Sequence, residues 1–250
     1  MTTHRKGTVL ITGGSRGIGA ETARLLAAEG YDLCITYATQ EDAARRVQVQ
    51  IEEAGRRCAI VRADLGEPDA ARALLQRIPE PLDPLVGLVN NAGITGPLGP
   101  FLKTSHETMK TVLEVNVLST LVLTQAVVAR WYLDGTKGSI VNVSSIAATL
   151  GAPGEYVHYA ATKAAIEAFT VGLARELAES GIRVNAVSPG TTLTDIHAAA
   201  GEPGRPFRVA ARIPMRRPAH ASEIAEGIVW LLGDRASYVT GTVLKVAGGL

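Results

Sequence analysis

Short apolar runs alternate with longer amphipathic segments along most of the chain. The apolar runs predict β-strands near residues 8–12, 32–36, 58–62, 85–89, 138–143, 183–187 and 242–246. Helical spacing of apolar residues between them predicts helices near residues 17–29, 40–54, 67–77, 105–130, 157–179 and 221–232. Several strands are apolar throughout, which is typical of a sheet covered on both faces. We therefore predict an α/β fold in which residues 1–250 form one doubly wound domain, with about seven parallel strands and helices on both faces.

The stretch 191–217 breaks this pattern. It is rich in Ala, Gly, Pro and Arg and has no clean period. Irregular segments of this length within a compact domain are usually functional. We therefore expect residues 191–217 to form a lid over a substrate site; the alternative is a surface excursion with no role.

Charge and composition exclude several classes of partner. The chain has 25 basic and 24 acidic side chains, a formal net charge of +1, and a hydrophobic fraction of 46%. This balance gives no reason to expect nucleic acid or an anionic membrane as a partner. No apolar run looks long enough to cross a bilayer, and residues 1–7 lack the apolar segment of a secretion signal. We expect a cytoplasmic protein.

Cysteine and histidine give no sign of a metal site. Cys34 and Cys58 lie inside predicted strands, where buried, reduced thiols are the expected state. The five histidines form no ligand-spaced cluster. We predict no catalytic metal.

The first strand leads into a glycine-rich turn. Residues 12–19 read Thr-Gly-Gly-Ser-Arg-Gly-Ile-Gly and open an amphipathic helix. Glycines allow a tight turn and close approach of a pyrophosphate, and the helix offers unpaired N–H groups and a positive dipole end. The turn therefore predicts a dinucleotide site; the alternative is a tight turn without a ligand.

Tyr159 and Lys163 lie four residues apart on a predicted helix, so their side chains share one face. An ammonium near a phenol favours the phenolate, which suits the tyrosine to proton transfer. Alone, the pair could be a core tyrosine beside a surface cation. Tyr156 is a rival only by proximity, because Ala160 lies four residues beyond it.

These motifs together resemble the short-chain dehydrogenase/reductase family, in particular its 3-oxoacyl-[acyl-carrier-protein] reductase-like branch. The resemblance rests on Thr-Gly-x-x-x-Gly-x-Gly at 12–19, Asn-Asn-Ala-Gly at 90–93 and Tyr-x-x-x-Lys at 159–163. It extends through Asp64-Leu65, Asn116, Ser144-Ser145, Ser188-Pro189-Gly190 and the glycines of 239–241 and 248–250. It covers nearly the whole chain and implies a Rossmann domain.

The resemblance implies four catalytic residues: Asn116, Ser145, Tyr159 and Lys163. Tyr159 is the expected acid or base, Lys163 lowers its pKa and binds the nicotinamide ribose, and the positive charge of the oxidised nicotinamide adds to the effect. Ser145, preferred to Ser144, orients the substrate. It precedes Tyr159 by 14 residues, one more than is usual, and we place the extra residue in loop 151–158.

Asn116 is expected to bend its helix and to hold a water that relays protons to the lysine. The alternative is a structural asparagine whose side chain is satisfied within the fold.

The resemblance also implies a set of cofactor contacts. Asp64 matches the residue that binds adenine, and Thr192 and Thr194 match the segment that holds the nicotinamide amide, whereas Asn91 could instead only stabilise the sheet. The predicted set is Gly13, Ser15, Arg16, Gly17, Ile18, Gly19, Thr36, Asp64, Leu65, Asn90, Ala92, Gly93, Tyr159, Lys163, Pro189, Gly190, Thr192 and Thr194.

The second strand favours NADP(H) over NAD(H). An acid at the end of this strand usually binds the ribose 2′-hydroxyl in NAD enzymes. Thr36 takes the acid's place here, and Asp32 lies at the start of the strand. Arg16 could pair with a 2′-phosphate, or it could be a solvated loop cation.

We therefore expect an NADP(H)-dependent oxidoreductase that moves a hydride between the nicotinamide and a carbonyl or secondary alcohol. The candidate substrates are small-molecule carbonyls and acyl thioesters, including 3-oxoacyl thioesters. The alternatives are an NAD(H)-dependent sugar or alcohol dehydrogenase of the same family and a non-catalytic nucleotide-binding regulator. The family implies a homotetramer that pairs helices 105–130 and 157–179 between subunits.

A cluster of arginines lies near the expected lid. It suggests either a patch for acyl carrier protein or, as the preferred interpretation, a solvated loop; its members are Arg205, Arg208, Arg212, Arg216 and Arg217.

Overall fold

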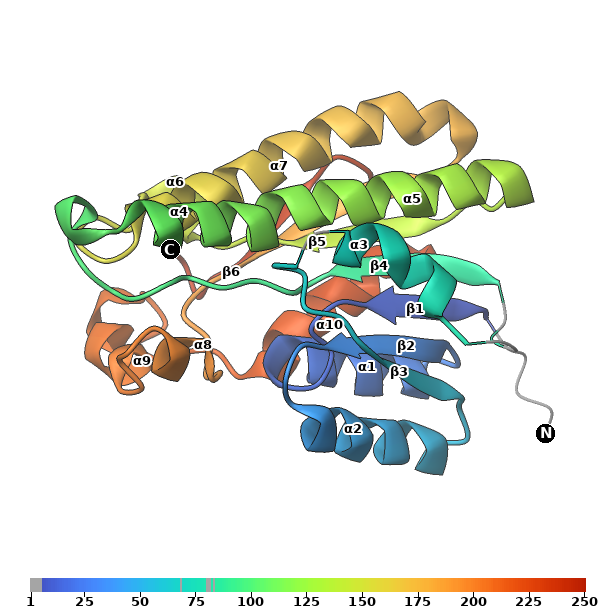
Figure 1. The fold of residues 1–250 in the computed structure, drawn as a ribbon, viewed down its shortest axis with the longest axis horizontal. Helices are drawn as coiled ribbons and strands as arrows, with labels where there is room; N and C mark the ends of the chain where they lie inside the picture. The colour runs from blue at the N-terminus through green and yellow to red at the C-terminus, as the bar shows by residue number, and fades with distance from the viewer. Residues whose placement is uncertain (1–5, 68, 80–81, 83) are drawn as a thin grey trace.

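A seven-stranded parallel sheet forms the centre of the computed structural model, which describes residues 6–67, 69–79, 82 and 84–250. The strand order is β3-β2-β1-β4-β5-β6-β7 (Figure 1). The strands are β1 (Thr8–Ile11), β2 (Asp32–Tyr37), β3 (Cys58–Arg62), β4 (Leu85–Asn90), β5 (Ser139–Val143), β6 (Arg183–Pro189) and β7 (Val243–Val246). The order reverses between β1 and β4, so their carboxyl ends define the place where ligands bind in such sheets.

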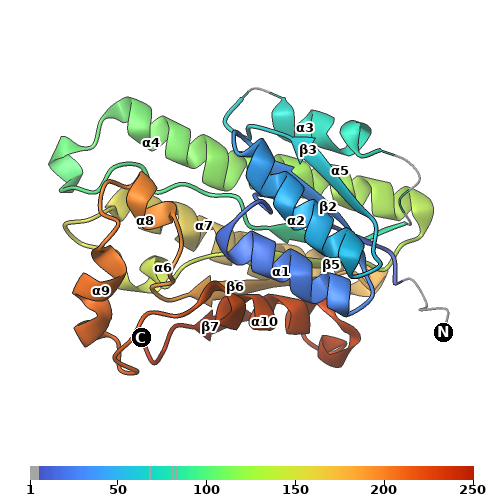
Figure 2. The same ribbon diagram turned by 90° about the horizontal axis from the view of Figure 1, so that it is seen from below.

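Helices cover both faces of the sheet (Figure 2). One face carries α1 (Gly17–Ala28), α2 (Glu41–Glu53) and α10 (Ala221–Leu232). The other carries α3 (Ala70–Ala73), α4 (His106–Leu113), α5 (Ser119–Asp134) and α7 (Val157–Leu177). Short helices lie at the carboxyl end of the sheet, namely α6 (Ala147–Leu150), α8 (Ile196–Ala199) and α9 (Arg205–Val209).

Alternation of side chains along β1 explains the two cores. Val9 and Ile11 pack into the cluster that lies under α1, α2 and α10, whereas Leu10 packs into the cluster under α5 and α7. All three side chains are fully buried. A strand with both faces covered must be apolar throughout, which is the pattern that the sequence shows.

The predicted strands and long helices agree with the structure to within a few residues. The predicted helix 105–130 is two helices, α4 and α5, joined by a π-helical turn at Glu114–Leu118. The predicted helix 67–77 is shorter: residue 68 lies outside the described residues, and the rest is α3 followed by a 3₁₀ turn at Leu74–Arg77.

The expectation that no segment could cross a bilayer was wrong by length and composition. The continuous helical segment His106–Asp134 has 29 residues and a mean hydropathy of 1.7 in its most apolar window. It nevertheless lies against the sheet, and Leu123, Val127 and Trp131 are buried in the core. The indole of Trp131 also donates to the carbonyl of Leu85 at 2.6 Å. We therefore interpret the segment as a core helix of a soluble domain.

The two cysteines are buried and not paired in a disulfide. Burial raises the pKa of the Cys34 thiol to about 12, and it also raises the pKa of Cys58. Both thiols are therefore held in the unreactive, protonated form.

Candidate active site

The glycine-rich turn is shaped by close backbone contacts. Gly13 has a φ of 64°, which favours glycine. A Cβ on Gly19 would lie 2.5 Å from the carbonyl oxygen of Gly13. The amide of Asn91 donates to the carbonyl oxygens of Thr12 and Gly13 at 2.9 and 3.0 Å. The turn therefore holds its shape without a ligand, and α1 begins beside it at Gly17.

Thr36 supports the same turn. Its hydroxyl accepts from the N–H of Gly13 at 3.1 Å, and its carbonyl accepts from the N–H of Gly14 at 2.9 Å. The strand ends one residue later, at Tyr37. Neither Thr36 nor Tyr37 carries a carboxylate, so β2 has no acid at its end. Asp32 is buried at the start of β2 and pairs with Arg57 at 2.7 Å.

A cavity of about 970 Å³ runs from this turn to Tyr159. Most of the predicted cofactor contacts line it: Gly13, Ser15, Arg16, Gly17, Ile18, Thr36, Asp64, Leu65, Ala92, Gly93, Tyr159, Lys163, Pro189, Gly190, Thr192 and Thr194.

Two predicted contacts do not line the cavity. Gly19 supports the turn from behind. The amide of Asn90 is buried and donates to Thr124 at 3.0 Å and to Asn142 at 2.8 Å. Asn91, the next residue, does line the cavity.

Tyr159 and Lys163 are both buried at the cavity wall, on one face of α7. The ammonium of Lys163 donates to the carbonyl of Val143 at 2.7 Å and lies 5.7 Å from the centroid of the Tyr159 ring. Burial lowers the pKa of Lys163 to about 8. Burial also raises the pKa of Tyr159 well above its ordinary value, and the hydroxyl of Ser145 opposes this in part.

These pKa values differ from the expectation that the lysine lowers the pKa of the tyrosine. Burial is the largest cause of both shifts, because removal from water disfavours the charged form of each group. The tyrosine is therefore held as a neutral phenol at neutral pH, the form that can donate a proton.

The two serines at the end of β5 have different surroundings. The hydroxyl of Ser144 donates to the carbonyl of Lys163 at 3.2 Å and to the carboxylate of Glu167 at 2.8 Å. Ser145 lines the cavity, and its hydroxyl accepts from the N–H of Ala147 at 3.1 Å. Because that bond uses the oxygen as an acceptor, the O–H of Ser145 can still donate, and its hydrogen bond to Tyr159 is what opposes the rise in the pKa of the phenol.

Asn116 lies in the π-helical turn between α4 and α5. Its amide donates to the carbonyl of Ile94 at 2.8 Å and to the hydroxyl of Thr162 at 3.1 Å, and its oxygen accepts from the N–H of Ile94 at 2.8 Å. A Cβ on Gly93 would lie 3.3 Å from the Asn116 oxygen and 3.4 Å from the ammonium of Lys163. The side chain is thus satisfied within the fold close to Lys163, outside the cavity lining.

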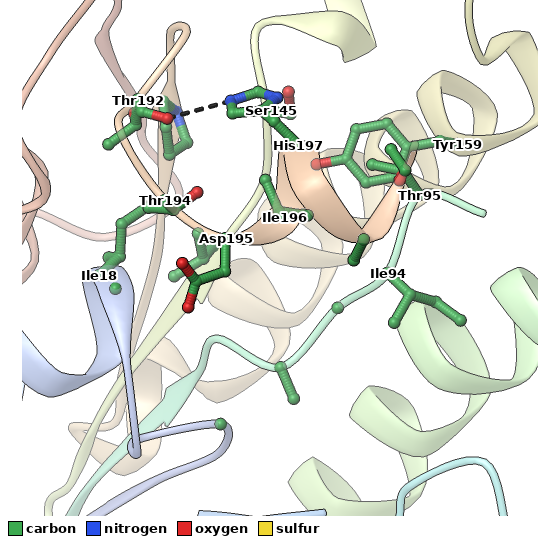
Figure 3. A pocket seen from close by; sticks show the side chains of 18 of the residues that line it. Ile18, Ile94, Thr95, Ser145, Tyr159, Thr192, Thr194, Asp195, Ile196 and His197 are labelled. Carbon is green, nitrogen blue, oxygen red and sulfur yellow. Dashed lines mark hydrogen bonds between the residues drawn. The ribbon is translucent and has the colours of Figure 1, made fainter. Parts of the chain in front are cut away.

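The segment 191–217 lies along the opposite wall of the cavity. It contains α8 and α9 and contributes Thr192, Thr194, Asp195 and His197 to the lining (Figure 3). Arg205 and Arg208, from α9, both pair with Glu155 of the loop before α7, at 2.5 and 2.8 Å.

The arginine cluster is largely neutralised by these and similar pairs. Arg208 also pairs with Glu202, and Arg217 pairs with Glu223 at 2.7 Å. Arg208, Arg212, Arg216 and Arg217 are all exposed, which agrees with the preferred interpretation of a solvated loop, although carboxylates pair with three of the five arginines.

An aromatic chain connects segment 191–217 to Tyr159. The rings of Tyr156 and Tyr159 meet edge to face, with centroids 5.3 Å apart. The guanidinium of Arg205 lies 5.0 Å from the centroid of the Tyr156 ring. From the sequence, Tyr156 was only a rival to Tyr159, because no local spacing relates Tyr156 to Arg205.

Sequence reasoning also missed two side chains near the far end of the cavity. Arg46 of α2 and Gln40 line an adjoining cavity together with Ser15 and Arg16. A basic residue on the helix after β2 was visible in the sequence, but only the fold places it beside the glycine-rich turn.

The residues present fit a nicotinamide dinucleotide. The turn leaves no room for a Cβ at Gly19 and offers N–H groups at the start of α1, which suits a pyrophosphate. The other end of the cavity has a buried phenol and ammonium and a partly buried hydroxyl, a set that suits proton transfer to an oxygen.

Comparison with known proteins assigns the class. A family model described as enoyl-(acyl carrier protein) reductase matches residues 13–250. The chain is 46% identical to an uncharacterized oxidoreductase, YgfF, of Escherichia coli, over 96% of this chain and 98% of that one. It therefore belongs to the short-chain dehydrogenase/reductase family and is an oxidoreductase.

Other relatives differ in what their names describe. An L-rhamnose 1-dehydrogenase (NAD(P)(+)) of Sphingomonas is 37% identical over 97% of this chain and 95% of its own. A 3-oxoacyl-[acyl-carrier-protein] reductase of Staphylococcus aureus is 33% identical over 96% of both chains. The structure of a short-chain dehydrogenase from Burkholderia cenocepacia in complex with NADP is 35% identical, covers 99% of both chains, and has a TM-score of 0.89.

Proposed function

We propose that this protein transfers a hydride between NADP(H) and a carbonyl or secondary alcohol, with Tyr159 as the acid or base. The observation that carries the proposal is one continuous cavity with a pyrophosphate-shaped turn at one end and Tyr159, Lys163 and Ser145 at the other. The bound nicotinamide would supply or accept the hydride.

The remaining chemistry belongs to the protein. Tyr159, held as a neutral phenol, donates a proton to the oxygen of a carbonyl substrate as negative charge develops there. The O–H of Ser145 turns from Tyr159 to donate to the same oxygen and so orients it. Lys163 places positive charge beside the phenolate that remains after proton transfer. Asn116 holds the backbone at Ile94, next to Gly93, which lies close to the ammonium of Lys163.

NADP(H) is supported by charge at the far end of the cavity. The end of β2 carries no acid at Thr36 or Tyr37, and Arg16 and Arg46 lie near it. Arg16 is half exposed and lies 3.5 Å from Asp195, so its guanidinium can reorient toward a 2′-phosphate. The NADP complex of the Burkholderia relative supports the same choice.

The substrate is a small-molecule carbonyl or an acyl thioester. The Staphylococcus relative supports reduction of a 3-oxoacyl thioester. The Sphingomonas relative supports the second candidate, a sugar or alcohol dehydrogenase that accepts NAD(H). Ion pairing of Arg205, Arg208 and Arg217 leaves less positive surface for an acyl carrier protein than the sequence suggested.

We further propose a cytoplasmic homotetramer in which residues 191–217 act as a lid. Exposed apolar side chains along the helical segment His106–Asp134 support pairing of this segment and of α7 between subunits, because Leu113, Leu118 and Leu133 are 52%, 48% and 85% exposed.

The direct test is reduction of a panel of ketones, sugars and 3-oxoacyl thioesters by wild type and Tyr159→Phe, with NADPH and NADH in parallel. We expect NADPH to be preferred and Tyr159→Phe to lower kcat by about 100- to 10,000-fold while NADPH still binds. Tyr156→Phe is the matched control and should retain most activity. Equal rates for Tyr159→Phe and wild type would contradict the proposed role.

A further inference from the structure

His197 of the lid has an unusual place in the cavity. It lies on α8, is 8% exposed, and lines the same cavity as Ser145 and Tyr159 (Figure 3). The charges of Arg205, Glu155 and Glu202 all act on it, which places it at the substrate end. The family motifs assign it no role.

One ring nitrogen of His197 has a fixed partner. Its Nε2 lies 3.0 Å from the carbonyl oxygen of Thr192, drawn as the dashed line in Figure 3. A carbonyl oxygen can only accept, so Nε2 carries the proton. In the neutral ring, Nδ1 is then an acceptor with a free lone pair.

The ring is held neutral near pH 7. Burial lowers the pKa of His197, the charge of Arg205 lowers it further, and the bond to Thr192 together with Glu155 and Glu202 opposes this. Nδ1 therefore remains an acceptor at physiological pH.

The lone pair of Nδ1 is open to the cavity. Among the described residues, no side chain or backbone group donates to it. Nδ1 of His197 therefore keeps some exposed surface. Nδ1 of His158, in contrast, is fully buried and has no partner in the described part of the chain. His158 is thus sealed in the protein, whereas His197, which lines the cavity, offers an acceptor to whatever enters it.

We infer that His197 is a specificity-determining residue that accepts a hydrogen bond from a hydroxyl near the reacting carbon of the substrate. This rests on the proposed function and narrows its substrate class to hydroxylated carbonyls and their polyol products. A 3-oxoacyl chain, which lacks a donor beside the ketone, gains nothing from Nδ1.

Three small ketones isolate this contact. 1-Hydroxypropan-2-one carries a donor next to the carbonyl, 1-methoxypropan-2-one keeps the oxygen without the donor, and butan-2-one replaces the hydroxyl with a methyl group. We expect wild type to show kcat/KM for the hydroxyketone at least about 3- to 10-fold above that for the methoxyketone, since one neutral hydrogen bond is at stake.

Two substitutions separate the contact from a structural role. The amide of His197→Gln can reach the carbonyl of Thr192, like Nε2, but leaves no acceptor at the place of Nδ1. The amide oxygen of His197→Asn lies near the place of Nδ1. We expect His197→Gln to lose the preference for the hydroxyketone through KM and His197→Asn to retain part of it, with Tm and NADPH affinity near those of wild type.

A binding measurement keeps the inference independent of turnover. Ligand-observed NMR titration of the NADP⁺-loaded enzyme with the same ketones gives their affinities where no reduction occurs. Loss of the hydroxyl preference in His197→Gln supports the inference even if the enzyme reduces none of the ketones, an outcome that would count against the proposed reductase alone. An unchanged preference in His197→Gln, by rate or by affinity, would overturn the inference while leaving the reductase intact.

Discussion

The two walls of the cavity are held by different kinds of interaction. The strand-end wall is held by hydrogen bonds between neutral side chains and the backbone, as where the side chains of Thr36 and Asn91 fix the glycine-rich turn. The lid meets the loop before α7 largely through charged side chains, with Arg205 and Arg208 on Glu155. The first wall therefore tolerates little change in shape, whereas the second can change its side chains and keep its fold.

The largest effect is expected at Lys163. This residue lies on α7, and its ammonium is fixed to the end of β5. Lys163→Met should lower kcat/KM by about 100-fold or more, because the phenolate of Tyr159 loses the ammonium that lies 5.7 Å from the centroid of its ring.

The same variant has a pH signature. The folded-state pKa of Lys163 is about 8, below the ordinary value of 10.5, so its protonation penalises the folded state fully below pH 8 and not above 10.5. The stability of Lys163→Met minus that of wild type should therefore fall by up to about 3 kcal/mol between pH 7 and 10.5. Denaturant unfolding at several pH values measures this, and parallel curves for the two proteins would contradict a buried ammonium.

The next largest effect is the difference between alanine substitutions at two glycines. Gly19 lies behind the glycine-rich turn, and Gly204 lies in segment 191–217. Gly19→Ala puts a Cβ 2.5 Å from a backbone oxygen, so it should weaken NADPH binding by about 10-fold and cost about 1–3 kcal/mol of stability. Gly204→Ala meets nothing within 4 Å and should change stability by no more than about 0.5 kcal/mol. Fluorescence titration with NADPH and thermal unfolding measure both. Equal losses at the two sites would remove the distinction between the walls.

The smallest effect on activity is expected at the lid. Glu155→Gln breaks two ion pairs and should raise the KM for substrate a few-fold and cost about 1–3 kcal/mol of stability. Burial raises the pKa of Glu155, but hydrogen bonds from Arg205 and Arg208 outweigh it and hold the pKa below 4.5.

This stabilisation is therefore present at neutral pH and is lost as the pH falls below 4.5. Hydrogen exchange across 202–212 should rise in the variant at pH 7 and approach that of wild type as the pH falls through the lowered pKa of Glu155. Glu223→Gln, which breaks an exposed pair outside the cavity lining, is the matched control and should leave exchange there unchanged.

The same contrast explains what could be predicted from the sequence. The strands, the glycine-rich turn and the pair Tyr159 and Lys163 depend on spacing within about twenty residues, so local patterns identify them. The contacts of Arg205 with Glu155 and Tyr156 join residues about 50 positions apart, with no local signal. The side chain of Asn90 turned from the cavity because burial beside Asn142 decided its partner. The roles of the site residues themselves stay predictions.

The π-helical turn at Glu114–Leu118 acts as a phase shift between two helices. There the N–H of Ser119 bonds to the carbonyl of Glu114, five residues back, so the turn holds one residue more than a regular helix needs. Deleting that residue would rotate α4 by about 100° relative to α5. Val112 would then leave the apolar cluster that it shares with Tyr156 and Tyr159. The number of residues in this helical segment thus sets the position of one wall of the substrate site. No substitution changes that number, whereas deletion of a single codon does.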